Sequence, residues 1–282
     1  MTDFDSLRAW IGRSETRADR ATAMPIAALA ATLDRDDPPP AEGTEVPPLW
    51  HWLYFTPLTR ASELGHDGHA KLGGFLPPVP LPRRMWAGGR LEFLQPLAVG
   101  DAITRESVIA DVSGKSGRSG ALVFVTVRHA IGHAGGVAVT EEHDIVYREA
   151  PRSGAPLQPP QAAPRDEAFT REIVPDPVLL FRYSALTFNG HRIHYDRSYV
   201  TEVEGYPGLV VHGPLIATLL LDLLRRERPQ ARVRGFAFKA LRPVFDIHRF
   251  SVCGRPDGEQ RYRLWARDHE GALAMQADAD IL

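Results

Sequence analysis

The feature that most restricts the fold is a helix-forming segment near residue 220 that is apolar on nearly every side. Pro214 follows Gly213 and suits the first turn of a helix, and the sequence LIATLLLDLLRR comes next. Asp222 is the only charged residue in this stretch before Arg225. A helix that is apolar all round must be surrounded by other structure. We therefore predict a buried helix that the rest of its domain wraps.

The segments most typical of strands occur as two hairpins, one in each half of the chain. The sequence ALVFVTVRHAI, over residues 121–131, is rich in β-branched residues and leads through a glycine-rich turn to a second strand over 137–146. Residues 261–266 and 272–282 repeat that hairpin. A first helix is expected over 25–33, where alanine dominates. Antiparallel strands curled around one buried helix predict an α+β fold of the hotdog type.

The two halves also resemble one another. HAGGVAVTEEHDIV, which starts at His133, aligns without gaps with HEGALAMQADADIL, which starts at His269, and LQPL at Leu94 resembles LRPV at Leu241. Two matches in the same order favour a duplicated domain. A proline- and alanine-rich stretch without apolar periodicity separates the halves. We predict a double hotdog with a first module over 1–150, a linker over 151–168 and a second module over 169–282.

Composition and charge exclude several classes of protein. A formal net charge of −2 lacks the basic footprint of a nucleic-acid-binding protein. The longest apolar stretch is far short of the ~20 residues that a membrane-spanning helix needs. The single cysteine, Cys253, excludes an intrachain disulfide, and the acidic N-terminal sequence lacks the apolar core of a signal peptide. We expect a cytoplasmic protein with neither a nucleic-acid nor a membrane partner.

The chemistry is expected in the segment FNGHRIHYD. Asn189, His191 and His194 lie close together, Gly190 interrupts any regular helix, and Asp196 follows where it could orient an imidazole. The two histidines could also be ordinary hydrogen-bonded residues or zinc ligands. Because no nearby cysteine or clear third ligand completes a zinc site, no metal is expected.

A glycine-rich loop leads from this segment through His212 and Gly213 to the start of the buried helix. Unpaired backbone N–H groups at a helix start would polarise a thioester carbonyl and stabilise an enolate. Pro214 has no N–H, so the Gly213 amide and those further into the first turn must serve. His194 could then move the proton of an attacking water.

The segment resembles the hydratase motif of the MaoC-like enoyl-CoA hydratases. In that motif an aspartate, an asparagine and a histidine precede a His–Gly pair at the head of the hotdog helix. His194 falls on the family's catalytic histidine, and Gly213 falls on the glycine whose amide forms the oxyanion hole. Asn189 stands where the family has its catalytic aspartate, and His191 stands where it has the asparagine. An amide cannot exchange a proton as a carboxyl does, so Asn189 is expected to position water or the thioester. His194 or His191 would then deliver the α-carbon proton.

TFNGHRIHYD, together with HDGHAKLGGFLPPVPLPRRMWAGG over residues 66–89, is similar to a narrower group that pairs a degenerate N-terminal hotdog with a catalytic C-terminal one. The likeness extends from about Pro48 onward. This group includes mesaconyl-C4-CoA (3-methylfumaryl-CoA) hydratases, itaconyl-CoA hydratases and mitochondrial hydroxyacyl-thioester dehydratases. The resemblance implies a hydro-lyase that acts on an acyl-CoA thioester, with no cofactor besides the coenzyme A of its substrate and with a homodimer left open.

Mesaconyl-C4-CoA is the favoured substrate on this resemblance, with itaconyl-CoA or a fatty 3-hydroxyacyl thioester as alternatives. Two alternatives from other classes are a hotdog thioesterase and a non-catalytic acyl-CoA-binding protein. The thioesterase would need a carboxylate base near the helix start, and Asn189 in the aspartate's place argues against it.

Arginines and aromatic residues complete the predicted substrate site. Arg83 or Arg84, in LPRRMWAGG, could grip a free carboxylate bidentately beside Trp86, or the pair could anchor a turn. His212 is also expected to contact the substrate. Arg242 and the other cations after the buried helix could bind the phosphates of coenzyme A, or they could be a solvated helix end. These other cations are Arg225, Arg226, Arg228, Arg232, Arg234 and Lys239.

Overall fold

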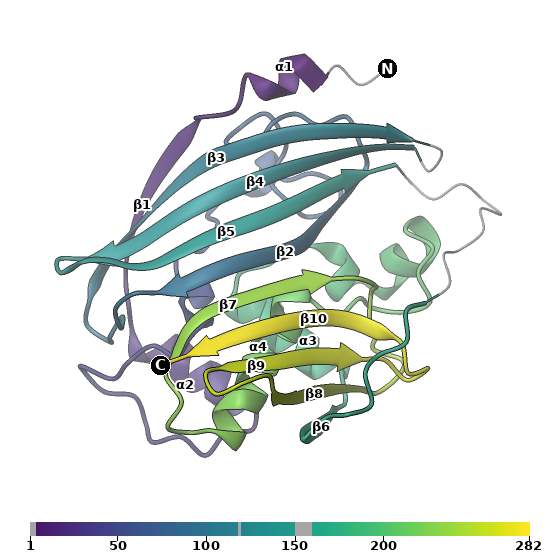
Figure 1. The fold of residues 1–282 in the computed structure, drawn as a ribbon. Helices are drawn as coiled ribbons and strands as arrows, with labels where there is room; N and C mark the ends of the chain where they lie inside the picture. Colours follow the sequence, from purple (N-terminus) through teal and green to yellow (C-terminus); the bar gives the residue numbers. More distant parts are fainter. Residues whose placement is uncertain (1–3, 118–119, 150–159) are drawn as a thin grey trace.

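A single antiparallel sheet of ten strands dominates the computed structural model, which describes residues 4–117, 120–149 and 160–282 (Figure 1). The strand order is β1-β3-β4-β5-β2-β7-β10-β9-β8-β6. The first half of the chain contributes β1 (Ser14–Arg20), β2 (Arg83–Phe93), β3 (Ala102–Gly117), β4 (Gly120–His133) and β5 (Gly136–Arg148). The second half contributes β6 (Phe169–Ile173), β7 (Val233–Ala240), β8 (Phe250–Pro256), β9 (Arg261–Arg267) and β10 (Leu273–Ile281). Both predicted hairpins are present, as β4–β5 and β9–β10.

The longer helices lie behind the second-half strands in Figure 1. They are α2 (Ala23–Thr32), α3 (Pro177–Leu186) and α4 (Gly213–Glu227), and a short α1 (Phe4–Arg8) begins the described chain. The described residues also form four short helical turns, namely η1 (Trp50–Leu53), η2 (Ala61–Glu63), η3 (Arg192–His194) and η4 (Tyr199–Val203). The helix predicted near residues 25–33 is α2. In the residues that the structure describes, no helix is long and apolar enough to cross a membrane.

Helix α4 is the predicted buried helix. Ten of its fifteen residues are buried, and it packs against β8, β9, β10, β6 and β2. A fully buried leucine or isoleucine side chain contributes about 1.5–3 kcal/mol to folding, so this helix supplies much of the hydrophobic stabilisation of the second half. The sheet curls around α4, as expected for a hotdog.

Matching hydrogen bonds in the two halves support the predicted duplication. The amides of Leu94 and Gln95 both donate to the carbonyl of Ala138, and those of Leu241 and Arg242 both donate to the carbonyl of Ala274. Ala138 and Ala274 are themselves partners in the sequence match of the two hairpins. The two halves therefore use the same backbone contacts at equivalent positions.

The halves join through the pairing of β2 with β7. This ladder runs from Gly88 opposite Lys239 to Glu92 opposite Gly235. Matching Leu94 with Leu241 also matches Gly88 with Gly235 and Glu92 with Lys239. This match turns the first pair of the ladder into the last pair, and the last pair into the first. The join therefore has approximate two-fold symmetry, and the two curled sheets run together into one.

We propose module boundaries at 1–150 and 169–282, with the linker over 151–168 between them. Residues 151–159 of this stretch lie outside the described residues. The later part lies along the second module, because the amide of Ala163 donates to the carbonyl of Gly271 and Ala162 bridges to Ala272.

The two modules differ in what fills the curl of the sheet. In the first module, α2 packs chiefly against α3 of the second. The hydrophobic cluster under β3, β4 and β5 is completed by Leu7, Val79 and Leu81, which come from outside the strands. Among the described residues, the first module therefore has no helix that matches α4.

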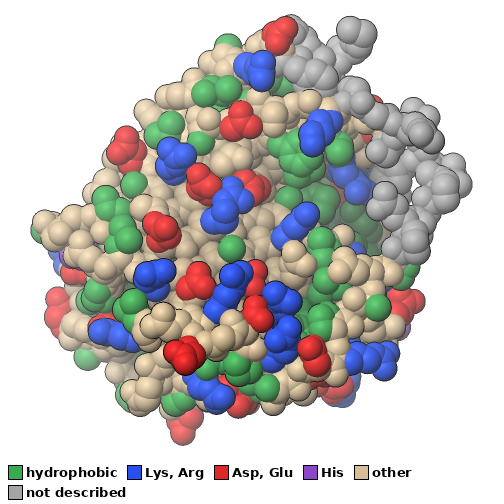
Figure 2. All heavy atoms as spheres, in the orientation of Figure 1, with side chains coloured by type: hydrophobic (Ala, Val, Ile, Leu, Met, Phe, Trp, Pro, Cys, Tyr) green, Lys and Arg blue, Asp and Glu red, His purple; other side chains and the backbone are tan. Residues whose placement is uncertain are grey.

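The outer face of the sheet carries charges of both signs, interspersed without a large patch of either (Figure 2). Arg90 on β2 pairs with Glu142 and Asp144 on β5, and Arg128 on β4 reaches Glu142 as well. These exposed pairs contribute little individually to stability. They keep this broad, solvated face of the sheet polar.

A buried carboxylate in the middle of α4 ties three elements together. Asp222 accepts hydrogen bonds from Arg35 after α2 (2.7 Å), from Arg171 on β6 (2.9 Å) and from Arg226 one turn further along α4 (2.8 Å). Its side chain is only 1% exposed. A buried charge is tolerated because it is paired in this way.

Replacing Asp222 should therefore cost far more than replacing an exposed acid of the same helix. We expect Asp222→Asn to lower the free energy of unfolding by about 3–5 kcal/mol, because three arginines lose their shared anion. The exposed Glu227 is the control, and Glu227→Gln should change stability by less than about 0.5 kcal/mol. Urea denaturation of both variants checks this, and equal stabilities would contradict the role given to Asp222.

Candidate active site

The loop that follows α3 carries Asn189 and His191. The amide of Asn189 donates to the carbonyl of Ser184 (2.8 Å), which closes the end of α3. The Asn189 Oδ1 atom then accepts the backbone N–H of His191 (3.0 Å). Asn189 therefore shapes the turn that presents His191, and its Nδ2 group forms no hydrogen bond within the described parts of the chain.

His194, at the end of η3, is held in one tautomer. Its Nδ1 atom lies 2.7 Å from the carbonyl oxygen of Val210, which can only accept a hydrogen bond, so Nδ1 carries the proton and Nε2 has a free lone pair. The side chain is buried, and burial lowers the pKa of His194 to about 4. His194 is therefore a neutral, oriented base at neutral pH.

His212 lies behind His194. The two rings stack with centroids 3.7 Å apart, and His212 Nε2 is 2.8 Å from Ser184 Oγ. His212 has no exposed surface, and burial holds its pKa well below the ordinary range. His212 is therefore too buried for the substrate contact that the sequence suggested. We assign it a positioning role instead, since its ring supports that of His194.

The amino end of α4 is open beside these histidines. No side chain caps it, and Pro214 at its start has no N–H. The amides of Gly213 and Leu215 are thus the donors of the first turn that can meet a ligand. A side chain at Gly213 would find its nearest neighbour, the carbonyl of Trp86, 3.8 Å away. This end of α4 therefore has room for the oxygen of a thioester, and its partial positive charge favours an enolate.

A loop from the first module completes the site. His69 Nδ1 lies 2.9 Å from Asp67 Oδ2, and the ring of His69 lies 4.0 Å from that of His191. The carbonyl of Asp67 also accepts the backbone N–H of Arg192 (2.9 Å). Sequence reasoning missed these two residues. The available signal was the HDGH sequence, which had contributed only to the family resemblance.

The site is electrostatically unusual because it gathers the imidazoles of His69, His191 and His194 around one anion. Burial, with the neighbouring His69 and His194, lowers the pKa of His191 to about 2, and burial also lowers the pKa of His69. Burial alone would raise the pKa of Asp67, but hydrogen bonds from His69 hold it well below its usual range. Asp67 is therefore ionised at neutral pH.

Asp67, His69 and His191 also place atoms that could bind a metal ion within 4.8 Å of one another. The Asp67 carboxylate, however, already engages His69 Nδ1. The cluster then offers one nitrogen from each histidine, which is fewer than the three protein ligands of a catalytic zinc site. We therefore interpret the cluster as an acid–base arrangement.

The two arginines at the start of β2 have different surroundings. Arg83 lies 3.3 Å from Glu204 Oε2 and donates to the Glu204 carbonyl (2.6 Å) and to the Tyr206 hydroxyl (3.3 Å). This matches the alternative in which an arginine anchors a turn. Arg84 forms no ion pair within the described residues. Its positive charge instead acts on His69 and His191, whose pKa values it helps to lower. Arg84 is thus the arginine whose charge faces the site.

Trp86 contributes to the wall beneath the helix start. Its ring contacts His143 (3.9 Å between centroids), Trp52 (4.9 Å) and Phe238 (5.8 Å). Its Nε1–H donates to the carbonyl of Gly88. The side chain is therefore held in an aromatic cluster, while its backbone faces Gly213.

Two other sequence-based expectations change with the structure. Asp196 does not orient an imidazole, because its carboxylate binds Arg192 and the amide of Tyr199. Most cations in the last turn of α4 and after it have protein partners, as in the alternative of a solvated helix end. The pairs are Arg225 with Asp37, Arg226 with Asp222, Arg228 with the Tyr262 hydroxyl, Arg232 with Glu45, and Arg242 with Asp268 and Glu270.

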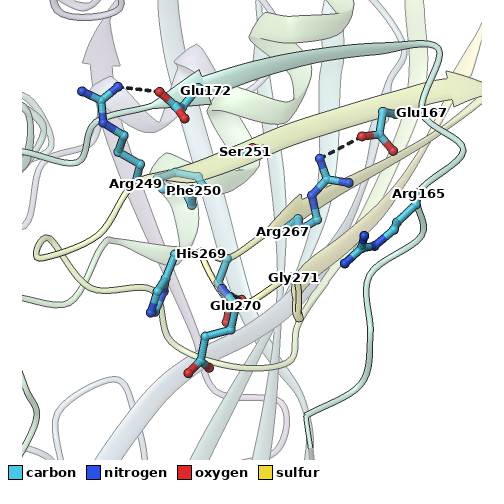
Figure 3. Close-up of a pocket in the computed structure, with 11 residues that line it drawn as sticks. Arg165, Glu167, Glu172, Arg249, Phe250, Ser251, Arg267, His269, Glu270 and Gly271 are labelled. Carbon is cyan, nitrogen blue, oxygen red and sulfur yellow. Dashed lines mark hydrogen bonds and ion pairs between the residues drawn. The ribbon is translucent and has the colours of Figure 1, made fainter.

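A separate hollow of about 620 Å³ lies on the second module, between β6 and the turn that joins β9 to β10 (Figure 3). Arg249 pairs with Glu172 across it, and Arg267 pairs with Glu167. Neither His194 nor Gly213 lines it. Because its charges neutralise one another and it lacks the helix start, we do not place the chemistry there.

The fold and this site define the class of protein. A continuous sheet curled around α4, with a histidine beside the helix start, is a double hotdog. Among solved structures, HtdX of Mycobacterium tuberculosis shares the fold, with a TM-score of 0.66 over 95% of this chain and 100% of that chain at 19% identity. A further Mycobacterium tuberculosis protein, described as a double hotdog, gives a TM-score of 0.60 over 99% of this chain and 98% of that one, at 13% identity.

Sequence comparisons identify the family within this class. The model of Htd2, hydroxyacyl-thioester dehydratase type 2, matches residues 49–246. The chain is 48% identical to the mesaconyl-C(4)-CoA hydratase of Chloroflexus aurantiacus over 97% of both sequences. It is 28% identical to the mitochondrial hydroxyacyl-thioester dehydratase type 2 of Schizosaccharomyces pombe, over 81% of this chain and 86% of that protein. The chain belongs to the Htd2 family of MaoC-like hotdog dehydratases, which confirms the resemblance.

The neutral histidines whose pKa values are lowered predict that the fold loses stability in mild acid. Their pKa values lie below the unfolded value of about 6.5, so the unfolded state takes up protons first as the pH falls. The free energy of unfolding should have its full value above pH 6.5. It should decline toward pH 4, by up to about 1.4 kcal/mol per pH unit for each histidine. The histidines concerned are His129, His143, His191, His194 and His212.

Urea denaturation at pH 7.5, 6, 5 and 4.5 measures this decline. His129→Gln, which removes one half-buried imidazole on β4, should make the decline shallower. An unfolding free energy that stays constant from pH 7.5 to 4.5 would contradict the assignment of neutral buried histidines.

Proposed function

We propose that the chain is a hydro-lyase that adds water to mesaconyl-C4-CoA (3-methylfumaryl-CoA), with His194 as its base. The main observation in support is the hydrogen bond that His194 Nδ1 donates to the Val210 carbonyl. This bond leaves Nε2 free beside the uncapped start of α4. The 48% identity over nearly the whole length to a mesaconyl-C(4)-CoA hydratase supports this substrate.

Each residue then has a defined part in the hydration. His194 Nε2 takes a proton from water as the water oxygen bonds to the β-carbon of the unsaturated thioester. The electrons of the double bond move onto the thioester oxygen, and the Gly213 amide stabilises the enolate that forms. A proton then adds to the α-carbon and restores the thioester carbonyl. Removal of water from the 3-hydroxyacyl thioester reverses these steps.

Asn189 is proposed to assist by position. Its Oδ1 atom is occupied by the amide of His191, so the Nδ2 group is the part that can meet water or the thioester oxygen. Because every donor and base in this scheme belongs to the chain, it requires no cofactor besides the coenzyme A of the substrate. We accordingly propose an acyl-CoA as the partner molecule and a cytoplasmic location, with a homodimer left open.

Arg84 is proposed to bind the free carboxylate of the substrate. A carboxylate enclosed near the Trp86 cluster would be too costly to desolvate without a cation. Arg83 is already neutralised by Glu204, whereas Arg84 has no carboxylate partner in the described parts of the chain. The same charge disfavours a long apolar acyl chain, which is the alternative that the dehydratases of the family suggest.

We expect His194→Ala to lower the rate of hydration by about 10²–10⁴-fold, the usual cost of losing a positioned general base. Loss of enoyl-thioester absorbance measures the rate, and circular dichroism checks that the variant folds. His269→Ala, at an exposed histidine on the β9–β10 turn, is the control and should hydrate at the wild-type rate. Wild-type turnover by His194→Ala would rule out the assignment.

The carboxylate contact is tested by comparing mesaconyl-C4-CoA with crotonyl-CoA, which lacks the carboxylate. Arg84→Lys should lower kcat/KM for mesaconyl-C4-CoA by about 10- to 100-fold, because two charge-assisted hydrogen bonds become one, and should leave crotonyl-CoA nearly unaffected. The neighbouring Arg83→Lys should affect both substrates alike. Faster turnover of crotonyl-CoA by the wild type, unchanged in the Arg84 variant, would exclude this substrate class.

A further inference from the structure

We infer that the Asp67–His69 pair, supplied by the first module, is the second acid–base group of the site and delivers the α-carbon proton. The inference rests on the proposed hydration. It assigns a proton-transfer role to the first module, which otherwise contributes the substrate-binding Arg84.

The need for a second group follows from Asn189. In the MaoC-like motif this position holds an aspartate that exchanges a proton, and an amide cannot do so. His194 has one free nitrogen, and that nitrogen takes the proton of water. His191, with a pKa of about 2, is neutral. We therefore assign the α-carbon proton to a separate donor beside these rings, in place of the delivery by His194 or His191 that the sequence suggested.

The geometry places one candidate pair there. His69 Nδ1 is 2.9 Å from Asp67 Oδ2, so the carboxylate fixes the ring and leaves Nε2 as the exchanging nitrogen. The ring of His69 is 4.0 Å from His191, and His191 is 5.4 Å from His194. The ring of His191 therefore lies between those of His69 and His194. A carboxylate that orients an imidazole in this way is a common arrangement in acid–base catalysis.

The loop that carries the pair is fixed against the histidine-bearing loop. The Asp67 carbonyl accepts a hydrogen bond from the Arg192 amide (2.9 Å). The His66 carbonyl accepts one from the Arg192 side chain (3.0 Å). Gly68 has a left-handed φ of 88°, and a Cβ atom there would collide with the carbonyl oxygen of Gly190. Such a close approach is possible only for glycine. The contact therefore sets the position of His69 relative to His191.

The surroundings separate the roles of the two imidazoles. Burial lowers the pKa of His69, Asp67 opposes this by favouring the charged ring, and Arg84 adds to the lowering. His194 has no carboxylate partner among the described residues, and its pKa lies near 4. Two titratable groups with unlike surroundings suit an acid and a base respectively. His69 is the better proton donor, and His194 is the better acceptor.

The protons of the hydration then balance, because His194 takes up one proton and His69 releases one. His194 Nε2 gains the proton of water as the C–O bond forms, and the enolate takes a proton from His69 Nε2 as the C–H bond forms. His69 becomes neutral and His194 becomes an imidazolium. Passage of one proton from His194 to His69, by way of the intervening His191 or solvent, restores the starting state.

The first experiment compares two histidines of the same loop. His69→Gln should lower kcat for hydration of mesaconyl-C4-CoA by about 10²–10⁴-fold. His66→Gln, at an exposed position three residues earlier, should retain the wild-type kcat. As the pH rises from 5 to 7, the wild-type rate should also fall, because the pKa of His69 lies below its ordinary value of about 6.5 and the ring loses its proton in this range. This fall should be absent from the residual rate of His69→Gln.

The second experiment restores the family's carboxylate. Asn189→Asp keeps the turn, since an aspartate oxygen can also accept the His191 amide, and it should raise the rate of the His69→Gln protein at least 10-fold. Asp67→Asn preserves the turn bond to the His69 amide and removes the charge, so it should lower kcat less than His69→Gln does. Both comparisons are made on variants with unchanged circular dichroism.

The outcomes separate this inference from the proposed function. Wild-type kcat in folded His69→Gln, with activity lost in His194→Ala, would overturn the inference and leave the hydratase intact. A wild-type protein that hydrates no enoyl-CoA would overturn the proposed function itself. Activity lost on chelation and restored by Zn²⁺ would also overturn the inference, because Asp67, His69 and His191 would then bind a metal.

Discussion

The burial of α4 is the constraint on which the rest of the structure depends. A helix with ten buried residues must be enclosed, and the second-half strands curl because they enclose it. Enclosure also places the amino end of the helix inside the protein, where its amides have no side-chain cap. The only charge in the buried part, Asp222, is offset by three arginines from three elements. The same packing that stabilises the fold thus creates an anion-stabilising end beside His194.

The site is assembled from both modules. The second supplies His194, His191 and the helix start, and the first supplies Arg84 and the Asp67–His69 loop. The β2–β7 ladder connects them, since β2 carries Arg84 near its beginning and pairs with the second module further along. Although the first module has no helix like α4, it retains a place in the proposed chemistry.

Much of this arrangement could be predicted from the sequence, because its signals are local. The apolar stretch after Gly213 predicted α4, the two glycine-turn hairpins predicted β4–β5 and β9–β10, and the motif around His194 predicted the family. What could not be predicted depends on contacts between distant residues. Asp196 binds Arg192 and not an imidazole, and Arg83 is neutralised by Glu204. His69 lies beside His191 although the two are more than a hundred residues apart in the sequence. His212 looked like a substrate contact because it adjoins Gly213, and only packing shows that it supports His194 from behind.

The most direct test of the central claim is a crystal structure of the His194→Ala protein with a bound 3-hydroxyacyl-CoA. The account predicts the thioester oxygen within hydrogen-bonding distance of the Gly213 amide, about 2.9 Å. The hydroxyl should lie at the vacated place of the His194 ring and the α-carbon should face His69. An acyl group bound elsewhere, for example in the hollow lined by Arg165, Arg249 and Arg267, would contradict it.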